Sequence, residues 1–210
     1  MVHAVDSIIF PPPPAIEIIK LLPADFSTFE LGLAKTGLTE VFDLAHTGGT
    51  LFAPSNFAFR ALGPRVNAFL FSAHGEKYLN ALLRYHIVAN QTLYSDAFYK
   101  GEAGDEEADK VADGVDIEAA PRGAYHVDLP TLLEGRSLSL DSVRFAGLIT
   151  IRINTFTKVA VKDGVAKDGV IHVVNSLLIP PKSPRGATYA GEEMSVEEFK
   201  ARFDSYVEEL

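Results

Sequence analysis

The segment from Lys167 to Pro181 constrains the fold of this chain more than any other stretch. Asp168-Gly169 is a turn pair, because glycine tolerates the positive φ that tight hairpin turns require. Residues Val170 to Val174 are β-branched except for His172, and their apolar character on both faces predicts a central strand covered on both sides. Pro180-Pro181 lacks backbone donors and ends the strand. We therefore expect His172 to be buried.

The N-terminus carries a second copy of this segment. Residues 2–12 align without gaps to residues 171–181 and share the His, a Val, the Ser and both prolines. Only the closing block is repeated, so the plainest interpretation is that residues 1–14 are a leading strand from the tail of a preceding, similar domain. This interpretation predicts a tandem arrangement, in which Pro11 to Pro14 form a stiff extended spacer.

Composition excludes several classes of function. At 210 residues and 47% hydrophobic, the chain can bury a full core, and we expect one domain over residues 15–181. It has no cysteine, so disulfides and zinc-thiolate sites are impossible. The net charge of -9 disfavours nucleic acid as a partner, because phosphate binding needs clustered Lys and Arg. No apolar run approaches the ~20 residues of a membrane helix, so we expect no membrane insertion.

Small helices are expected in the N-terminal third and strands in the C-terminal third. Capping boxes that begin at Ser27 and Ser195 predict two helix starts, and the second opens a terminal amphipathic helix. That helix follows a polar linker within residues 182–210, and its apolar face needs this domain or a partner to pack on. Leu148 to Asn154 alternates apolar and polar residues, as a strand does. The order of elements predicts the α+β class.

Motifs for metals and cofactors are missing. Residues 102–116 contain seven acids against one lysine, which predicts a solvated loop. A calcium loop is the sharper alternative, although the ligand order of such loops is not present. The histidines are scattered without a His-x-x-x-His pair, so we expect no metal site. Neither a phosphate-binding loop nor a Gly-x-Ser-x-Gly elbow occurs, and we expect no cofactor.

Three blocks resemble the signature segments of fasciclin domains. Residues 50–59 (Thr-Leu-Phe-Ala-Pro-Ser-Asn-Phe-Ala-Phe) resemble the first block, and residues 82–88 (Leu-Leu-Arg-Tyr-His-Ile-Val) resemble the family's Tyr-His segment. Residues 168–175 (Asp-Gly-Val-Ile-His-Val-Val-Asn) resemble the second block. The blocks follow the family's order and span most of residues 15–181. The resemblance implies a β-sandwich or wedge with a bundle of small helices packed at one side. Residues 163–169 and 194–199 look most like those of fungal members of the family.

Two positions depart from the family pattern. The first block more often has an acid where Phe57 stands, and the second usually ends in Asp where this chain has Asn175. The polar contacts that those acids make in relatives are therefore in doubt here.

The resemblance implies one of two functions. Many fasciclin domains are secreted or cell-surface adhesion modules, which predicts a cell-surface or matrix protein or glycan as partner and an extracellular location. Some fungal members are associated with natural-product pathways, which predicts an intracellular cyclase that holds an aromatic intermediate in an apolar pocket and closes a ring with acid or base assistance. The family favours adhesion, while the absence of a secretion signal in the sequence as given fits the second function.

Five residues are candidates for the site. The resemblance points to Tyr85 and His86 as binding residues, because the family's Tyr-His pair is linked to integrin-type adhesion. For an enzyme, the acid, base and orienting groups are expected, in no assignable order, among Tyr85, His86, His172, Asn56 and Arg84. The alternative is that both histidines lie in the core with their polar atoms hydrogen-bonded. Asn90 opens a glycosylation sequon that is meaningful only in a secreted chain.

Overall fold

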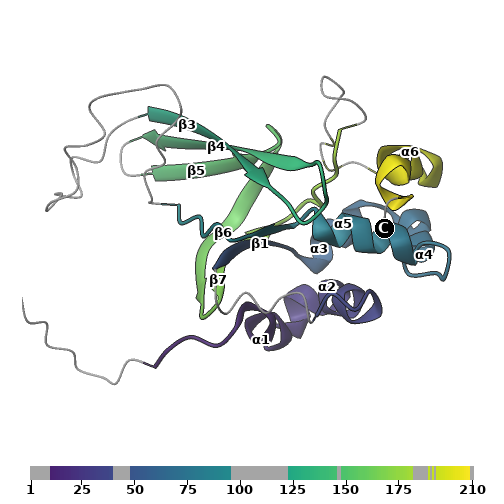
Figure 1. Ribbon diagram of the computed structural model, residues 1–210, viewed down its shortest axis with the longest axis horizontal. Helices are drawn as coiled ribbons and strands as arrows, with labels where there is room; N and C mark the ends of the chain where they lie inside the picture. The colour runs from purple at the N-terminus through teal and green to yellow at the C-terminus, as the bar shows by residue number, and fades with distance from the viewer. Residues whose placement is uncertain are drawn as a thin grey trace, which may run out of the picture.

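The computed structural model of the chain describes residues 10–39, 48–95, 123–145, 148–181, 189, 191 and 193–208. The expectations for the leading copy at residues 1–9, for the acidic stretch 102–116 and for most of the linker after Pro181 lie outside these residues. The described elements form a mixed α+β fold, as expected from the sequence. Figure 1 shows the helices gathered at one end, while part of the sheet extends away from them.

The strands in the described part of the chain form one seven-stranded sheet in the order β2-β1-β7-β6-β5-β4-β3. Neighbouring strands are antiparallel except β1 and β7, which are parallel and place Phe52 opposite His172. Beyond the edge strand β3, the backbone N–H of Leu132 donates to the carbonyl of Ile87 in β2 at 2.9 Å, so the sheet is nearly closed. The strand bounds are β1 (Gly49–Pro54), β2 (Ile87–Ala89), β3 (Gly123–Pro130), β4 (Ser137–Phe145), β5 (Leu148–Ile153), β6 (Thr157–Ala166) and β7 (Gly169–Val174).

The helix bounds are α1 (Ala15–Lys20), α2 (Pro23–Lys35), α3 (Asn56–Ala61), α4 (Pro64–Leu70), α5 (Glu76–Arg84) and α6 (Val196–Val207). Among the described residues, α1 and α2 precede β1, α3 to α5 lie between β1 and β2, and α6 follows β7. A proline opens both α2 and α4, where its missing N–H costs nothing. The predicted cap at Ser195 is confirmed, since its Oγ accepts the N–H of Glu198 at 3.1 Å. The predicted start at Ser27 is wrong, because α2 already begins at Pro23.

One hydrophobic core joins the sheet to the helices. The central position of β7 is confirmed, because it lies between β1 and β6 and His172 has no exposed surface. The terminal helix α6 packs on α4 and α5 of this domain, with Phe199 and Phe203 fully buried. Its apolar face is therefore covered by this domain.

The entry of the chain into the domain is tied to the turn between β6 and β7. The carboxylate of Asp168, which is buried, accepts the N–H of Ala15 at 2.7 Å and so bonds one of the free donors at the start of α1. Next to it, the N–H of Lys167 donates to the carbonyl of Pro13 at 3.0 Å. The polyproline segment is thereby fixed on the hairpin before α1 begins.

Candidate functional site

His86 lies in the core at the junction of α5 and β2. Its Nδ1 is 2.8 Å from the carbonyl of Leu82, and its Nε2 accepts the N–H of Leu178 at 3.0 Å, which assigns the proton to Nδ1. The ring is fully buried, and burial lowers its pKa to about 4, against a smaller opposing effect of the Leu82 carbonyl. His86 is thus a neutral side chain whose two hydrogen bonds link the end of α5 to the segment after β7, and such a side chain is called a brace below.

His172 makes the same kind of brace from the middle of β7. Its Nε2 donates to the carbonyl of Leu93 at 2.7 Å, while its Nδ1 accepts the N–H of Asp163 at 3.3 Å. The ring stacks on Phe52 across the parallel pair, with centroids 5.6 Å apart. Burial is also the main cause that lowers the pKa of His172. Both ring nitrogens of each of these histidines are therefore occupied by backbone groups.

Tyr85 is buried beside His86 but points to the other half of the sheet. Its hydroxyl accepts the Nδ2 N–H of Asn154 at 3.0 Å and lies 3.4 Å from the carbonyl of Ser137. Only 1% of the residue is exposed, and burial raises the pKa of its hydroxyl. Tyr85 and His86 thus contact different parts of the core, and a ligand reaches them only if this packing opens.

Asn56 holds α3 against α2. Its Oδ1 accepts the N–H of Thr28 at 2.9 Å, and its Nδ2 donates to the carbonyl of Ala24 at 3.0 Å. In an α-helix the N–H of residue 28 normally donates to the carbonyl of residue 24. The side-chain amide of Asn56 therefore bonds both the donor and the acceptor of one backbone hydrogen-bond pair of α2. This side chain is a joint between the two helices.

The two signature blocks meet next to Asn56. Ser55 caps α3 through its Oγ, and the same hydroxyl donates to Oδ1 of Asn175 at 3.2 Å. The amide oxygen of Asn175 thus accepts a bond that a carboxylate could also accept. An open cleft of about 310 Å³, named here the first-block cleft, is lined by Asp25, Ser55, Asn56, Phe57, Arg60 and Asn175. Phe57 is 60% exposed at this cleft.

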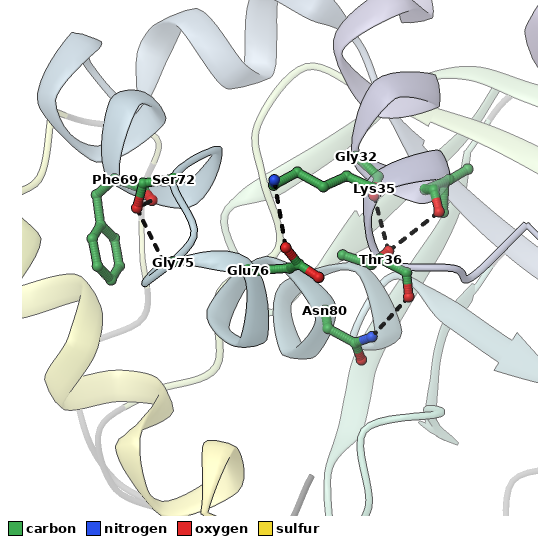
Figure 2. Close-up of polar contacts among 9 residues, drawn as sticks. Gly32, Lys35, Thr36, Phe69, Ser72, Gly75, Glu76 and Asn80 are labelled. Atoms are coloured by element: carbon green, nitrogen blue, oxygen red, sulfur yellow. Dashed lines mark hydrogen bonds and ion pairs between the residues drawn. The ribbon is translucent and has the colours of Figure 1, made fainter.

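Arg84 lies at a second, larger cleft between the end of α2 and one face of α5. This α5 cleft has a volume of about 500 Å³ and is lined by Thr36, His74, Glu76, Lys77, Asn80 and Arg84, among others. Figure 2 shows Lys35 and Thr36 of the α2 end facing Glu76 and Asn80 of α5. The Nζ of Lys35 is 3.4 Å from a carboxylate oxygen of Glu76, and Nδ2 of Asn80 donates to the carbonyl of Thr36 at 3.3 Å.

The five candidate residues do not converge on one site. His86, His172 and Tyr85 are in the core, Asn56 is at the first-block cleft, and Arg84 is at the α5 cleft. Their roles in binding or catalysis stay predictions. Asn90 of the sequon is exposed just after β2 and has a φ of 62°. Its glycosylation likewise stays a prediction.

His74 and Lys77 of the α5 cleft are not among the site residues predicted from the sequence. A signal for this face was present, because Glu76, Asn80 and Arg84 recur every four residues, opposite the apolar side of the same helix. Among the residues that the structure describes, no three His, Asp or Glu side chains gather as a metal site would require. In that same part of the chain, no helix is long and apolar enough to cross a membrane.

Comparison with known proteins places these observations in context. The family model for the fasciclin domain matches residues 24–180. Aurofusarin biosynthesis cluster protein S of Gibberella zeae is 32% identical over 193 residues, which cover 86% of this chain. The aligned part is 45% of that relative, so this chain spans less than half of its length. A solved FAS1 domain pair from the insect cell adhesion molecule Fasciclin I has the same fold, with a TM-score of 0.57 and 17% identity over 80% of this chain and 51% of that one.

Proposed function

The chain belongs to the fasciclin domain family, and from that premise we propose that it is a binding module whose role is adhesion to a cell-surface or matrix protein or glycan. The observation that carries the proposal is the bonding of the candidate proton-transfer groups. His86 and His172 each have both ring nitrogens bonded to backbone, and the hydroxyl of Tyr85 is bonded in the core. An acid-base catalyst needs such a group within reach of the substrate.

The first-block cleft is the surface we assign to the partner. Phe57 offers an exposed aromatic ring, and Arg60 is an exposed cation on the same helix. Aromatic side chains, phenylalanine included, and arginine are enriched at the cores of protein interfaces. Asn56 sets the distance between α3 and α2 and so holds the walls of this cleft in place.

A pair of phenylalanine variants tests this assignment. The intact protein and the Phe57→Ala and Phe156→Ala variants are measured by biolayer interferometry on immobilised fibronectin and on the β-glucan laminarin. Phe156 is a matched control, because it is 56% exposed in the turn between β5 and β6, away from the cleft. We expect binding to one surface and a loss of about tenfold or more in affinity for Phe57→Ala only. Absence of binding to both surfaces, or an equal loss in both variants, would contradict the proposal.

The relative from a biosynthesis cluster supports the second candidate function, an enzyme that acts on an aromatic natural-product intermediate. Under this alternative we expect the proton-transfer residue among Tyr85, His86 and His172, released from its present bonds. Incubation with a panel of small phenols such as 2-naphthol, followed by mass spectrometry, tests it. Turnover that His172→Gln abolishes without a change in melting temperature would favour the enzyme over the adhesion module, whereas no turnover of any phenol would count against it.

A further inference from the structure

We propose that the α5 cleft is an oxyanion-binding site, which takes a carboxylate, sulfate or phosphate group of a small ligand or an acidic sugar. The proposal does not depend on the adhesion function, because it concerns a different surface from the first-block cleft. It rests on the charges of the cleft, on the way in which Arg84 is held, and on the size of the cleft.

The charge of the cleft runs against that of the whole chain. The chain has a net charge of -9, yet Lys77, Arg84 and His74 all line this one cleft. The acid among the lining residues, Glu76, has its carboxylate 3.4 Å from the Nζ of Lys35. This ion pair cancels the negative charge locally and leaves Lys77 and Arg84 in excess. An oxyanion entering from solvent therefore meets a positive field.

The guanidinium of Arg84 is oriented before a ligand arrives. Its Nε donates to Oδ1 of Asn80 at 2.7 Å, and Asn80 is itself anchored by its bond to the carbonyl of Thr36. Within the described part of the chain this guanidinium makes one hydrogen bond, through Nε, so the N–H groups on its two Nη atoms are available to a ligand. Two parallel N–H groups of this kind match the two oxygens of a carboxylate or sulfate.

The start of α5 adds to the same field. Gly75 stands at the N-cap without a side chain to accept from the first turn, and Glu76 and Lys77 of that turn line the cleft. The free N–H groups at this end carry partial positive charge. At about 500 Å³ and open to solvent, the cleft has the size of a small-molecule or single-sugar site.

Calorimetry at low ionic strength with three probes tests the proposal: sodium sulfate, 2-naphthoate and a heparin oligosaccharide. The probes separate a free inorganic anion, a small aromatic acid and a sulfated glycan as sources of the oxyanion. We expect at least one to bind, with affinity reduced about tenfold in Arg84→Gln and about threefold in Lys77→Gln. Arg152→Gln is the control, because it removes the same charge from the exposed face of β5.

The Glu76→Gln variant is expected to bind the probe more tightly, and a gain in affinity cannot result from misfolding. Removing this carboxylate releases Lys35 and should raise the affinity about twofold to threefold. It also keeps the test valid if Arg84→Gln lowers the melting temperature, because Glu76 and Lys77 are both exposed. The proposal is overturned if no probe binds the native protein, if Arg152→Gln weakens binding as much as Arg84→Gln does, or if Glu76→Gln weakens it.

Discussion

The two halves of the sheet share the same backbone hydrogen bonding, but their side chains have different surroundings. At one end every residue of β1 is buried, and β7 beside it is buried at most positions. At the other end the residues of β5 alternate between solvent and core, with Leu148 72% exposed. Figure 1 shows the cause, since the helices gather near β1 and β7 while β3, β4 and β5 reach away from them. The contrast indicates that β1 and β7 are buried on both faces because the helices cover this half of the sheet.

Histidines at the two ends differ accordingly. His86 and His172 are neutral braces whose pKa is lowered by burial. His126 on β3 is exposed, and its Nδ1 is 2.8 Å from a carboxylate oxygen of Asp141 on β4. The hydrogen bond to Asp141 is the main cause that raises the pKa of His126, with a smaller contribution from Asp128. One residue type is thus a buried hydrogen-bonding group with a lowered pKa in one half of the sheet and an exposed group with a raised pKa in the other.

Replacing these histidines by alanine should give the largest difference. His86→Ala leaves the carbonyl of Leu82 and the N–H of Leu178 without a partner and opens a cavity, so we expect a loss of about 4 kcal/mol in the free energy of unfolding. His126→Ala should cost less than about 1 kcal/mol, because its ion pairs are exposed. Urea denaturation at neutral pH measures both. Similar losses in the two variants would break the comparison.

Acidification should lower the free energy of unfolding, because the buried histidines have lowered pKa values. The folded pKa of His86 is about 4, below its ordinary value of 6.5, so the unfolded chain binds the proton first. The stabilisation is present above pH 6.5 and is lost as the pH falls towards about 4, by roughly 3 kcal/mol at 1.4 kcal/mol per pKa unit. His172 acts in the same direction.

His126 acts in the opposite direction, and this sharpens the test. Because its pKa is raised, the stabilisation it gives is present at low pH and lost as the pH rises through its folded pKa. Urea denaturation of the native protein and of His126→Ala, from about pH 4 to about pH 8, compares the two. We expect stability to rise with pH in both, and more steeply in the variant. A stability that is flat between pH 4 and 6.5 would refute the burial argument for His86.

Two glycines provide a smaller contrast. Gly169 starts β7 with a φ of 152°, and an added Cβ would lie 2.3 Å from the carbonyl oxygen of Gly49. Gly135, between β3 and β4, has a φ of 69° with nothing within 4 Å of an added Cβ. Gly169→Ala should therefore cost about 3 kcal/mol and Gly135→Ala about 1 kcal/mol, since the second carries conformational strain alone. Thermal unfolding followed by circular dichroism ranks the pair, and the reverse order would contradict the contact.

Much of the fold could be predicted because single segments carry local signals. The β-branched run of β7 predicted a buried strand, and the Ser195 box predicted α6. The same kind of box at Ser27 failed, because Pro23 supplies an earlier start for α2. The parallel pairing of β1 with β7 has no local signal, since neither strand encodes its distant partner.

The candidate sites were less accessible to sequence reasoning. The apolar residues beside His86 and His172 indicated that both are buried. The partners of their ring nitrogens are backbone groups, which every residue type has, so the sequence could not predict which residues supply them. The spacing of Asn80 and Arg84 could have predicted their contact on α5. The carbonyl of Thr36 that anchors Asn80 comes from another helix and depends on the tertiary fold.

The anchor of the polyproline entry also determines how the domain meets mechanical load. A pull on the chain at Phe10 reaches the bonds from Lys167 to Pro13 and from Ala15 to Asp168 before it reaches α1. The force is therefore delivered to the hairpin of β6 and β7, whose second strand is in the middle of the sheet. A tether attached there strains a largely buried interior strand, while α1 stays helical until the two bonds break.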